Sequence, residues 1–120
     1  MSRLRRLHSA TANTFRGLAH AARSERAVQE ELAVLALAVP VGVFLAPDPG
    51  WYVAMLGALV AVLTVELLNT AVEKLADRVT REWDAEIGVV KDVSSAAVFG
   101  AMVLAALVWL AALALRFGVV

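Results

Sequence analysis

Five polar residues share one helical face in a largely apolar part of the chain: Glu66, Asn69, Thr70, Glu73 and Asp77. At 100° per residue these positions form one narrow stripe, while leucine and valine occupy the opposite side. A charged side chain near the middle of a bilayer costs about 3 kcal/mol on insertion scales and is rarely found there without a functional reason. We therefore expect the stripe to carry chemistry rather than only a structural hydrogen bond to another helix.

The residue types in and near the stripe indicate phosphoryl transfer. Carboxylates one or two turns apart suit Mg²⁺, which takes hard oxygen ligands and commonly shares them with substrate phosphates. Lys91 can supply a positive charge to such phosphates. Glu66 lies about 10 Å deeper along the helix than Glu73 and suits a general base. Because the chain has neither GxxxxGK[ST] nor GxGxxG, a nucleotide would be held without a glycine-rich cradle. Together these residues predict metal-assisted transfer of a phosphoryl group to a hydroxyl group at the membrane boundary.

Membrane-spanning helices must position these residues. Hydrophobic residues make up 61% of the 120 positions and the mean hydropathy is +0.75, which is too apolar for a soluble domain. Apolar runs predict transmembrane helices at about 31–47, 50–72 and 93–115, of which the first is short and contains Pro40. We expect an all-α membrane protein in which residues 1–120 form a single integral membrane domain.

The distribution of charge predicts the orientation of the chain. Basic residues are frequent in segments 1–30 and 73–92, whereas only Arg116 follows the third apolar run. The positive-inside rule therefore places the N-terminus in the cytoplasm. Segment 1–30 alternates apolar and basic residues with a helical period, which predicts an amphipathic helix on the surface of the bilayer. The first long apolar run starts only at Leu32, so we expect an uncleaved N-terminus. A net charge of zero gives no reason to expect nucleic acid as a partner.

Two sequence segments resemble a known family. ELLNTAVEKLADR at 66–78 and KDVSSAAV at 91–98 are together similar to the prokaryotic diacylglycerol kinases, small trimeric membrane lipid kinases that include the undecaprenol kinases. The resemblance extends from about Arg6 to the C-terminus. It implies ATP- and Mg²⁺-dependent phosphorylation of diacylglycerol to phosphatidic acid at the cytoplasmic face of the bacterial inner membrane. It also implies a homotrimer whose active sites are shared between neighbouring subunits.

The resemblance implies roles for individual residues as well. Glu66 matches the general base, and Glu25 and Glu73 match the metal-binding glutamates. The positions that match ATP contacts are Arg6, Asn13, Glu25, Glu73, Glu82, Trp83, Asp84, Lys91 and Asp92. The positions that match the lipid substrate's side of the site are Arg6, Ala10, Glu31, Glu66, Asn69, Ser95 and Trp109. Two positions depart from the family pattern, because Asn13 stands where tyrosine is common and Asp84 where histidine is common.

Two alternatives compete with a diacylglycerol kinase. Undecaprenol kinase is the alternative within the family, although DR at 77–78 and SSAAV at 94–98 favour the diacylglycerol branch. A proton-coupled membrane transporter subunit is the alternative from another class, because it too would bury a glutamate. The kinase is favoured, since the charged residues gather at the cytoplasmic boundary, where ATP is available, and not near the membrane midplane.

Overall fold

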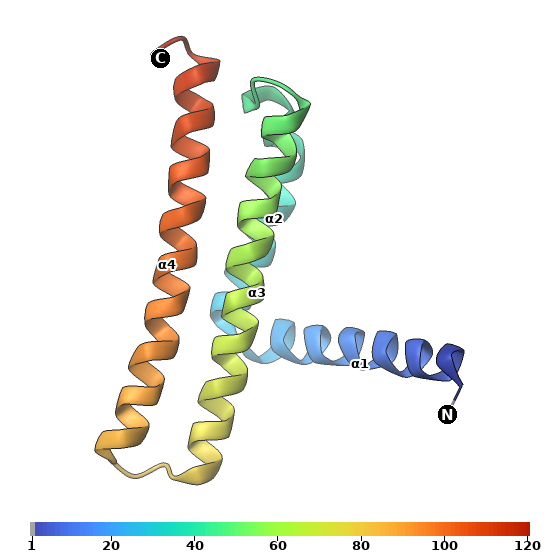
Figure 1. Ribbon diagram of the computed structural model, residues 1–120, viewed down its shortest axis with the longest axis vertical. Coiled ribbons are helices and arrows are strands. Elements are labelled where there is room, and N and C mark those ends of the chain that lie inside the picture. The colour runs from blue at the N-terminus through green and yellow to red at the C-terminus, as the bar shows by residue number, and fades with distance from the viewer. Residues whose placement is uncertain (1) are drawn as a thin grey trace.

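The computed structural model describes residues 2–120 as four α-helices without strands. They are α1 (Arg3–Ser24), α2 (Arg26–Leu45), α3 (Pro49–Val79) and α4 (Ala85–Arg116). Helices α2, α3 and α4 run alongside one another, and α1 projects sideways from them (Figure 1). The expected all-α architecture is confirmed.

Helices α2, α3 and α4 are each long and apolar enough to cross a membrane, as expected. A bilayer needs only about 20 residues, but α3 has 31 and α4 has 32. Their additional turns lie at the end where loop 80–84 connects them, and these turns carry the charged residues of 73–92 (Figure 1). The polar stripe and Lys91 therefore stand on continuous helices rather than on loops.

Helix α1 is amphipathic and lies across the direction of the other helices. Leu4, Leu7 and Phe15 remain exposed on it in the single chain. A helix that projects at this angle from three spanning helices is suited to lie on the surface of the bilayer with its apolar side chains in the lipid. The surface segment is shorter than the expected 1–30, because α1 ends at Ser24 and α2 already begins at Arg26. Glu25 alone separates the two helices, in an extended backbone conformation.

Small and branched side chains pack α3 against α4. Ala58, Val62 and Ala105 form the buried cluster between these helices. Small residues allow helix backbones to approach closely, which is the main source of attraction between helices in a lipid environment. This interface fixes the register of α4 against α3, and with it the polar residues that face each other nearer loop 80–84.

The opposite end of the bundle is fixed by contacts to α2. The hydroxyl of Tyr52 donates a hydrogen bond to the carbonyl oxygen of Val39 at 2.8 Å, next to Pro40. The ring of Tyr52 fits against Gly42, where an added Cβ would lie 3.1 Å from a ring carbon. Nε of Arg116 donates to the carbonyl oxygen of Phe44 at 3.1 Å and so attaches the end of α4 to the last turn of α2.

Candidate active site

The predicted polar stripe lies on one face of α3 and becomes more exposed toward loop 80–84. Glu66, Asn69 and Thr70 are buried, with 7–8% of their surface exposed, although the surrounding residues are largely apolar. Glu73, about one turn further along, is exposed. The stripe thus leads from the solvent-accessible end of the helix into the apolar part of the bundle.

Two hydrogen bonds join α4 to this stripe, from Ser94 and from Lys91, and a third connects two residues of the stripe within α3. Oγ of Ser94 donates to Oδ1 of Asn69 at 2.7 Å, and Nδ2 of Asn69 donates to Oε1 of Glu73 at 3.3 Å. Nearer the loop, Nζ of Lys91 donates to Oδ1 of Asp77 at 2.7 Å. Ser94 and Lys91 are three positions apart and therefore face the same side of α4. Asn69 is oriented by contacts on both sides and in turn orients Glu73.

Ser94 is the serine of α4 that contacts the stripe, whereas Ser95 was expected on the lipid substrate's side of the site. Ser95 is exposed on the surface of the single chain. The one-residue difference corresponds to a rotation of 100° around the helix. The spacing to Lys91 was the sequence signal that could have selected Ser94.

The beginning of α2 adds two further carboxylates to the site. Oε1 of Glu25 lies 3.4 Å from Nζ of Lys74. Both carboxylate oxygens of Glu31 are buried without a hydrogen-bond partner in the described part of the chain. Glu66 lies within electrostatic range of Glu25 and Glu73, and Glu31 lies within electrostatic range of Glu66. The structure therefore gathers four glutamates, two from α2 and its preceding junction and two from α3.

Glu25 and Glu73 offer carboxylate oxygens, which are the type of ligand that a divalent cation takes, but they do not form a closed metal site. Within residues 2–120 no three or more His, Cys, Asp or Glu side chains are close enough together to hold a metal ion by themselves. The other three glutamates are each within electrostatic range of Glu66, but the four do not form a closed ligand set. Mg²⁺ is commonly bound by one or two carboxylates together with substrate phosphates and water. The donor atoms present match that pattern.

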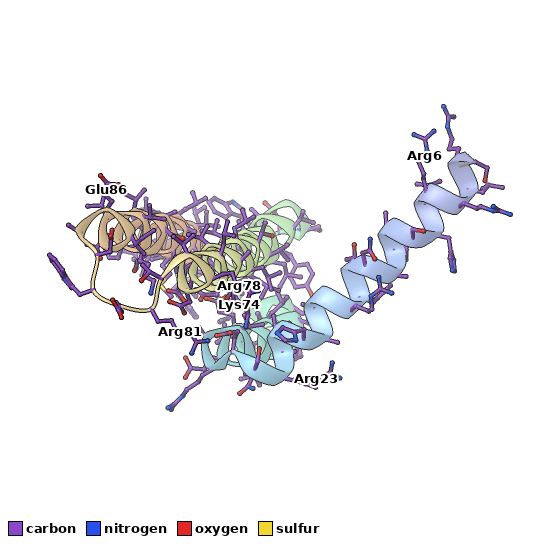
Figure 2. The ribbon with its side chains drawn as sticks, turned by 90° about the horizontal axis from the view of Figure 1, so that it is seen from below. Arg6, Arg23, Lys74, Arg78, Arg81 and Glu86 are labelled. Atoms are coloured by element: carbon purple, nitrogen blue, oxygen red, sulfur yellow. The ribbon has the colours of Figure 1, made fainter. Side chains whose placement is uncertain are left out.

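Arg6 and Ala10 lie far from these glutamates in the same chain. Arg6 is at the free end of α1, remote from Lys74 and Arg78 (Figure 2). The part of α1 from Arg6 to Ser24 spans about 27 Å at 1.5 Å per residue. The predicted convergence of Arg6 and Glu66 therefore does not occur within one chain.

Asn13 lies on α1, at a hollow between this helix and α3. The hollow has a volume of about 450 Å³ and is also lined by Gly17, Leu67 and Lys74. The side-chain oxygen of Asn13 accepts a hydrogen bond from Arg16, one turn away on the same helix. The hollow extends along α3 from Leu63 to Lys74, at the level of the buried part of the stripe.

The predicted nucleotide residues of loop 80–84 and the start of α4 have different environments. Trp83 is 90% exposed, and Glu82 and Asp92 are exposed as well. Oδ1 of Asp84 accepts hydrogen bonds from the backbone N–H groups of Glu86 and Ile87, both at 3.0 Å. Asp84 is thus the N-cap of α4, a position where aspartate is among the preferred residues. The sequence interpretation assigned it only to nucleotide and missed this structural function.

Trp109 forms a hydrogen bond between two of the spanning helices. Its Nε1 donates to the carbonyl oxygen of Met55 at 3.0 Å, and Met55 is fully buried. The indole N–H is therefore used inside the chain. This contact gives Trp109 a structural function beside the lipid contact expected for it.

Replacing Trp109 by phenylalanine should lower the free energy of unfolding by about 1 kcal/mol, because hydrogen bonds between membrane helices contribute on this scale. Reversible unfolding in mixed micelles measures the change. Trp83→Phe is the matched control, since Trp83 is 90% exposed and should leave stability unchanged. A Trp109→Phe variant with normal stability and a raised KM for lipid would assign the indole to substrate binding instead.

Comparison with known proteins shows the family of the chain. The family model for prokaryotic diacylglycerol kinase matches residues 12–113. The chain belongs to this family. It is similar to the diacylglycerol kinase of Escherichia coli (strain K12), with 33% identity over 113 residues that cover 94% of this chain and 93% of the relative. It is also similar to the diacylglycerol kinase of Haemophilus influenzae, with 32% identity over 106 residues that cover 88% of this chain and 90% of the relative.

Membership of the prokaryotic diacylglycerol kinase family confirms the expected enzyme class. The matched region includes α2, α3, nearly all of α4 and the second half of α1, so the four glutamates, Asn69 and Lys91 all lie inside it. Of the two classes considered, kinase and transporter subunit, the comparisons support the kinase.

Proposed function

We propose that this chain transfers the γ-phosphoryl group of ATP to the free hydroxyl of diacylglycerol, with Mg²⁺, at the cytoplasmic face of the inner membrane. The observation that carries the proposal is the cluster of Glu25, Glu31, Glu66 and Glu73, which begins at the exposed end of α3 and continues into its apolar part. A water-soluble nucleotide can approach the exposed side of this cluster. A lipid headgroup can approach the buried side from the bilayer.

The buried carboxylates suit the acceptor side of the reaction. Glu66 accepts the proton of the lipid hydroxyl while the oxygen forms its bond to the γ-phosphorus and the bond to the leaving ADP oxygen breaks. Glu31 presents two buried oxygens without partners in the described part of the chain, and from diacylglycerol they can accept a hydrogen bond only from the free hydroxyl, because the ester groups have no hydrogen to donate. Asn69 is held by Ser94 and orients Glu73 toward the nucleotide side.

Glu25 and Glu73 are the residues that would hold Mg²⁺, which when bound would neutralise charge on the nucleotide phosphates. In the structure, the ammonium group of Lys74 occupies the vicinity of Glu25. The other lysine of the site, Lys91, is fixed by Asp77 close to the same exposed end of α3. Both lysines therefore accompany the carboxylates at the side from which the nucleotide approaches.

The distance of Arg6 from Glu66 supports a homotrimer with shared sites. Arg6 cannot act at the glutamates of its own chain without a large movement of α1 (Figure 2). In a symmetric ring of subunits, each projecting α1 can reach the glutamates of a neighbour instead. The exposed apolar side chains along α4, including Phe99, Leu107 and Leu110, leave room for contacts to a second subunit and to lipid. The positive-inside rule places the N-terminus and loop 80–84 in the cytoplasm.

A kinase assay tests the proposed reaction. Purified protein in mixed micelles is offered labelled ATP with diacylglycerol or undecaprenol, in Mg²⁺ or in EDTA. We expect labelled phosphatidic acid in Mg²⁺ and none in EDTA. Faster labelling of undecaprenol would assign the chain to the alternative substrate. If neither lipid is labelled, the proposal is wrong.

A further inference from the structure

A second polar feature lies where α3 ends, beside the glutamate cluster. It is a hollow of about 460 Å³ whose lining residues are Lys74, Asp77, Arg78, Thr80 and Arg81. Figure 2 shows Lys74, Arg78 and Arg81 together at this end of α3, with Arg6 far away along α1. Lys74 and Asp77 are connected to the site described above through Glu25 and Lys91, whereas Arg78, Thr80 and Arg81 have been given no function there. We call it the basic hollow.

Most charges around the basic hollow are already paired, but its two arginines are not. Asp77, its only acidic lining residue, is held by Lys91 at 2.7 Å. Lys74 lies 3.4 Å from Glu25. Within residues 2–120 neither Arg78 nor Arg81 forms an ion pair. The hollow therefore contains two guanidinium groups available to an anion.

The lining of the basic hollow also offers a hydroxyl group. Oγ1 of Thr80 accepts a hydrogen bond from the backbone N–H of Glu82 at 3.2 Å. A hydroxyl that accepts one hydrogen bond still has its own hydrogen to donate. A ligand in the hollow would thus meet two guanidinium groups and one hydroxyl donor, while the negative charge of Asp77 is offset by Lys91.

We propose that the basic hollow binds a phosphate group, held by Arg78 and Arg81. Guanidinium forms paired hydrogen bonds with phosphate oxygens and is favoured wherever such planar recognition is needed. Two compounds at this boundary carry the required group, a nucleotide from the cytoplasm and an anionic phospholipid headgroup from the membrane. The proposal concerns binding alone and does not require that Glu25 and Glu73 hold a metal ion.

Calorimetric titration of the full-length protein in zwitterionic micelles tests the proposal. One arm uses ADP in EDTA, and the other uses short-chain phosphatidic acid in the same buffer. The double variant Arg78→Gln/Arg81→Gln should bind at least one of these probes roughly tenfold more weakly than the wild type. Weakening with ADP alone identifies a nucleotide site, and weakening with the lipid alone identifies a headgroup site.

Two further variants show whether geometry or total charge is responsible. Arg23→Gln/Arg26→Gln removes the same charge near the α1–α2 junction, outside the basic hollow, and should bind as the wild type does. Arg78→Lys/Arg81→Lys keeps the charge but loses paired hydrogen bonding, and should bind with intermediate affinity. Circular dichroism and size-exclusion chromatography select variants that fold like the wild type.

The proposal is overturned if the wild type binds neither probe, if the double glutamine variant binds both as tightly as the wild type, or if the control variant weakens binding equally. Kinase activity is measured separately on the same samples. Normal activity with lost phosphate binding would leave the proposed reaction in place, whereas intact phosphate binding in a chain without kinase activity would reject only that reaction.

Discussion

Glu66→Gln should lower kcat about 10²- to 10⁴-fold, the range typical for loss of a general base, with nearly unchanged binding of Mg·ATP. Glutamine keeps the size of the side chain and its capacity for hydrogen bonds, but it cannot accept the proton of the lipid hydroxyl. Glu66 is only 8% exposed, so bulk water cannot readily replace it as the base. Steady-state kinetics with ATP and Mg²⁺ titrations measure both quantities.

Glu73→Gln is the informative comparison, because Glu73 is exposed about two turns nearer the loop. We expect this variant to raise the KM for Mg·ATP and to recover part of its rate when Mg²⁺ is increased. The same recovery in Glu66→Gln would show that Glu66 is also a metal ligand. A normal kcat in Glu66→Gln would exclude it as the base.

The sequence was informative where a regular helical period coincided with a large free-energy cost of placing polar groups in the bilayer. A bilayer excludes unpaired polar groups, so long apolar runs can only be helices, and α2, α3 and α4 follow from them. The helical period of 100° per residue then places Glu66, Asn69 and Glu73 on one face. Their proximity within α3 therefore did not depend on tertiary structure.

Features that depend on where a helix begins or ends could not be predicted from the sequence. The break at Glu25 has no proline or glycine to mark it, since α1 and α2 meet at a single extended residue. For the same reason the surface segment was expected to reach residue 30. The capping function of Asp84 depends on where α4 begins, which hydrophobic periodicity does not specify because the first turns of α4 lie outside the apolar run.

The contact between Ser94 and Asn69 depends on the rotation of α4 against α3. Ser94 reaches Asn69 because Ala105 packs against Ala58 and Val62 further along the same helix pair. A packing contact of this kind cannot be obtained from the period of one helix alone. The separation of Arg6 from Glu66 likewise follows from the direction of α1, which a single extended residue allows to diverge from α2.

Mixing Arg6→Ala with Glu66→Gln should restore activity to two variants that are each nearly inactive. In the proposed trimer, Arg6 of one subunit completes a site with Glu66 of the next. With random mixing at equal amounts, each site has an intact Arg6 and an intact Glu66 with a probability of one half each, so about a quarter of the sites should work. Subunits are exchanged in denaturing detergent, returned to mixed micelles and assayed for kinase activity against the mixing ratio.

The matched control mixes Glu66→Gln with Asn69→Ala. Both residues are buried on the same face of one α3, so no site can obtain both intact groups and activity should stay at the level of the single variants. Recovery in the Arg6 mixture but not in this control would assign the α1 contribution to a neighbouring subunit. If the Arg6 mixture shows no recovery in trimers proven to be mixed by differential tags, Arg6 does not act at a neighbour's Glu66. A movement of α1 within one chain would then be needed to bring the arginine across the distance of about 27 Å that its helix spans.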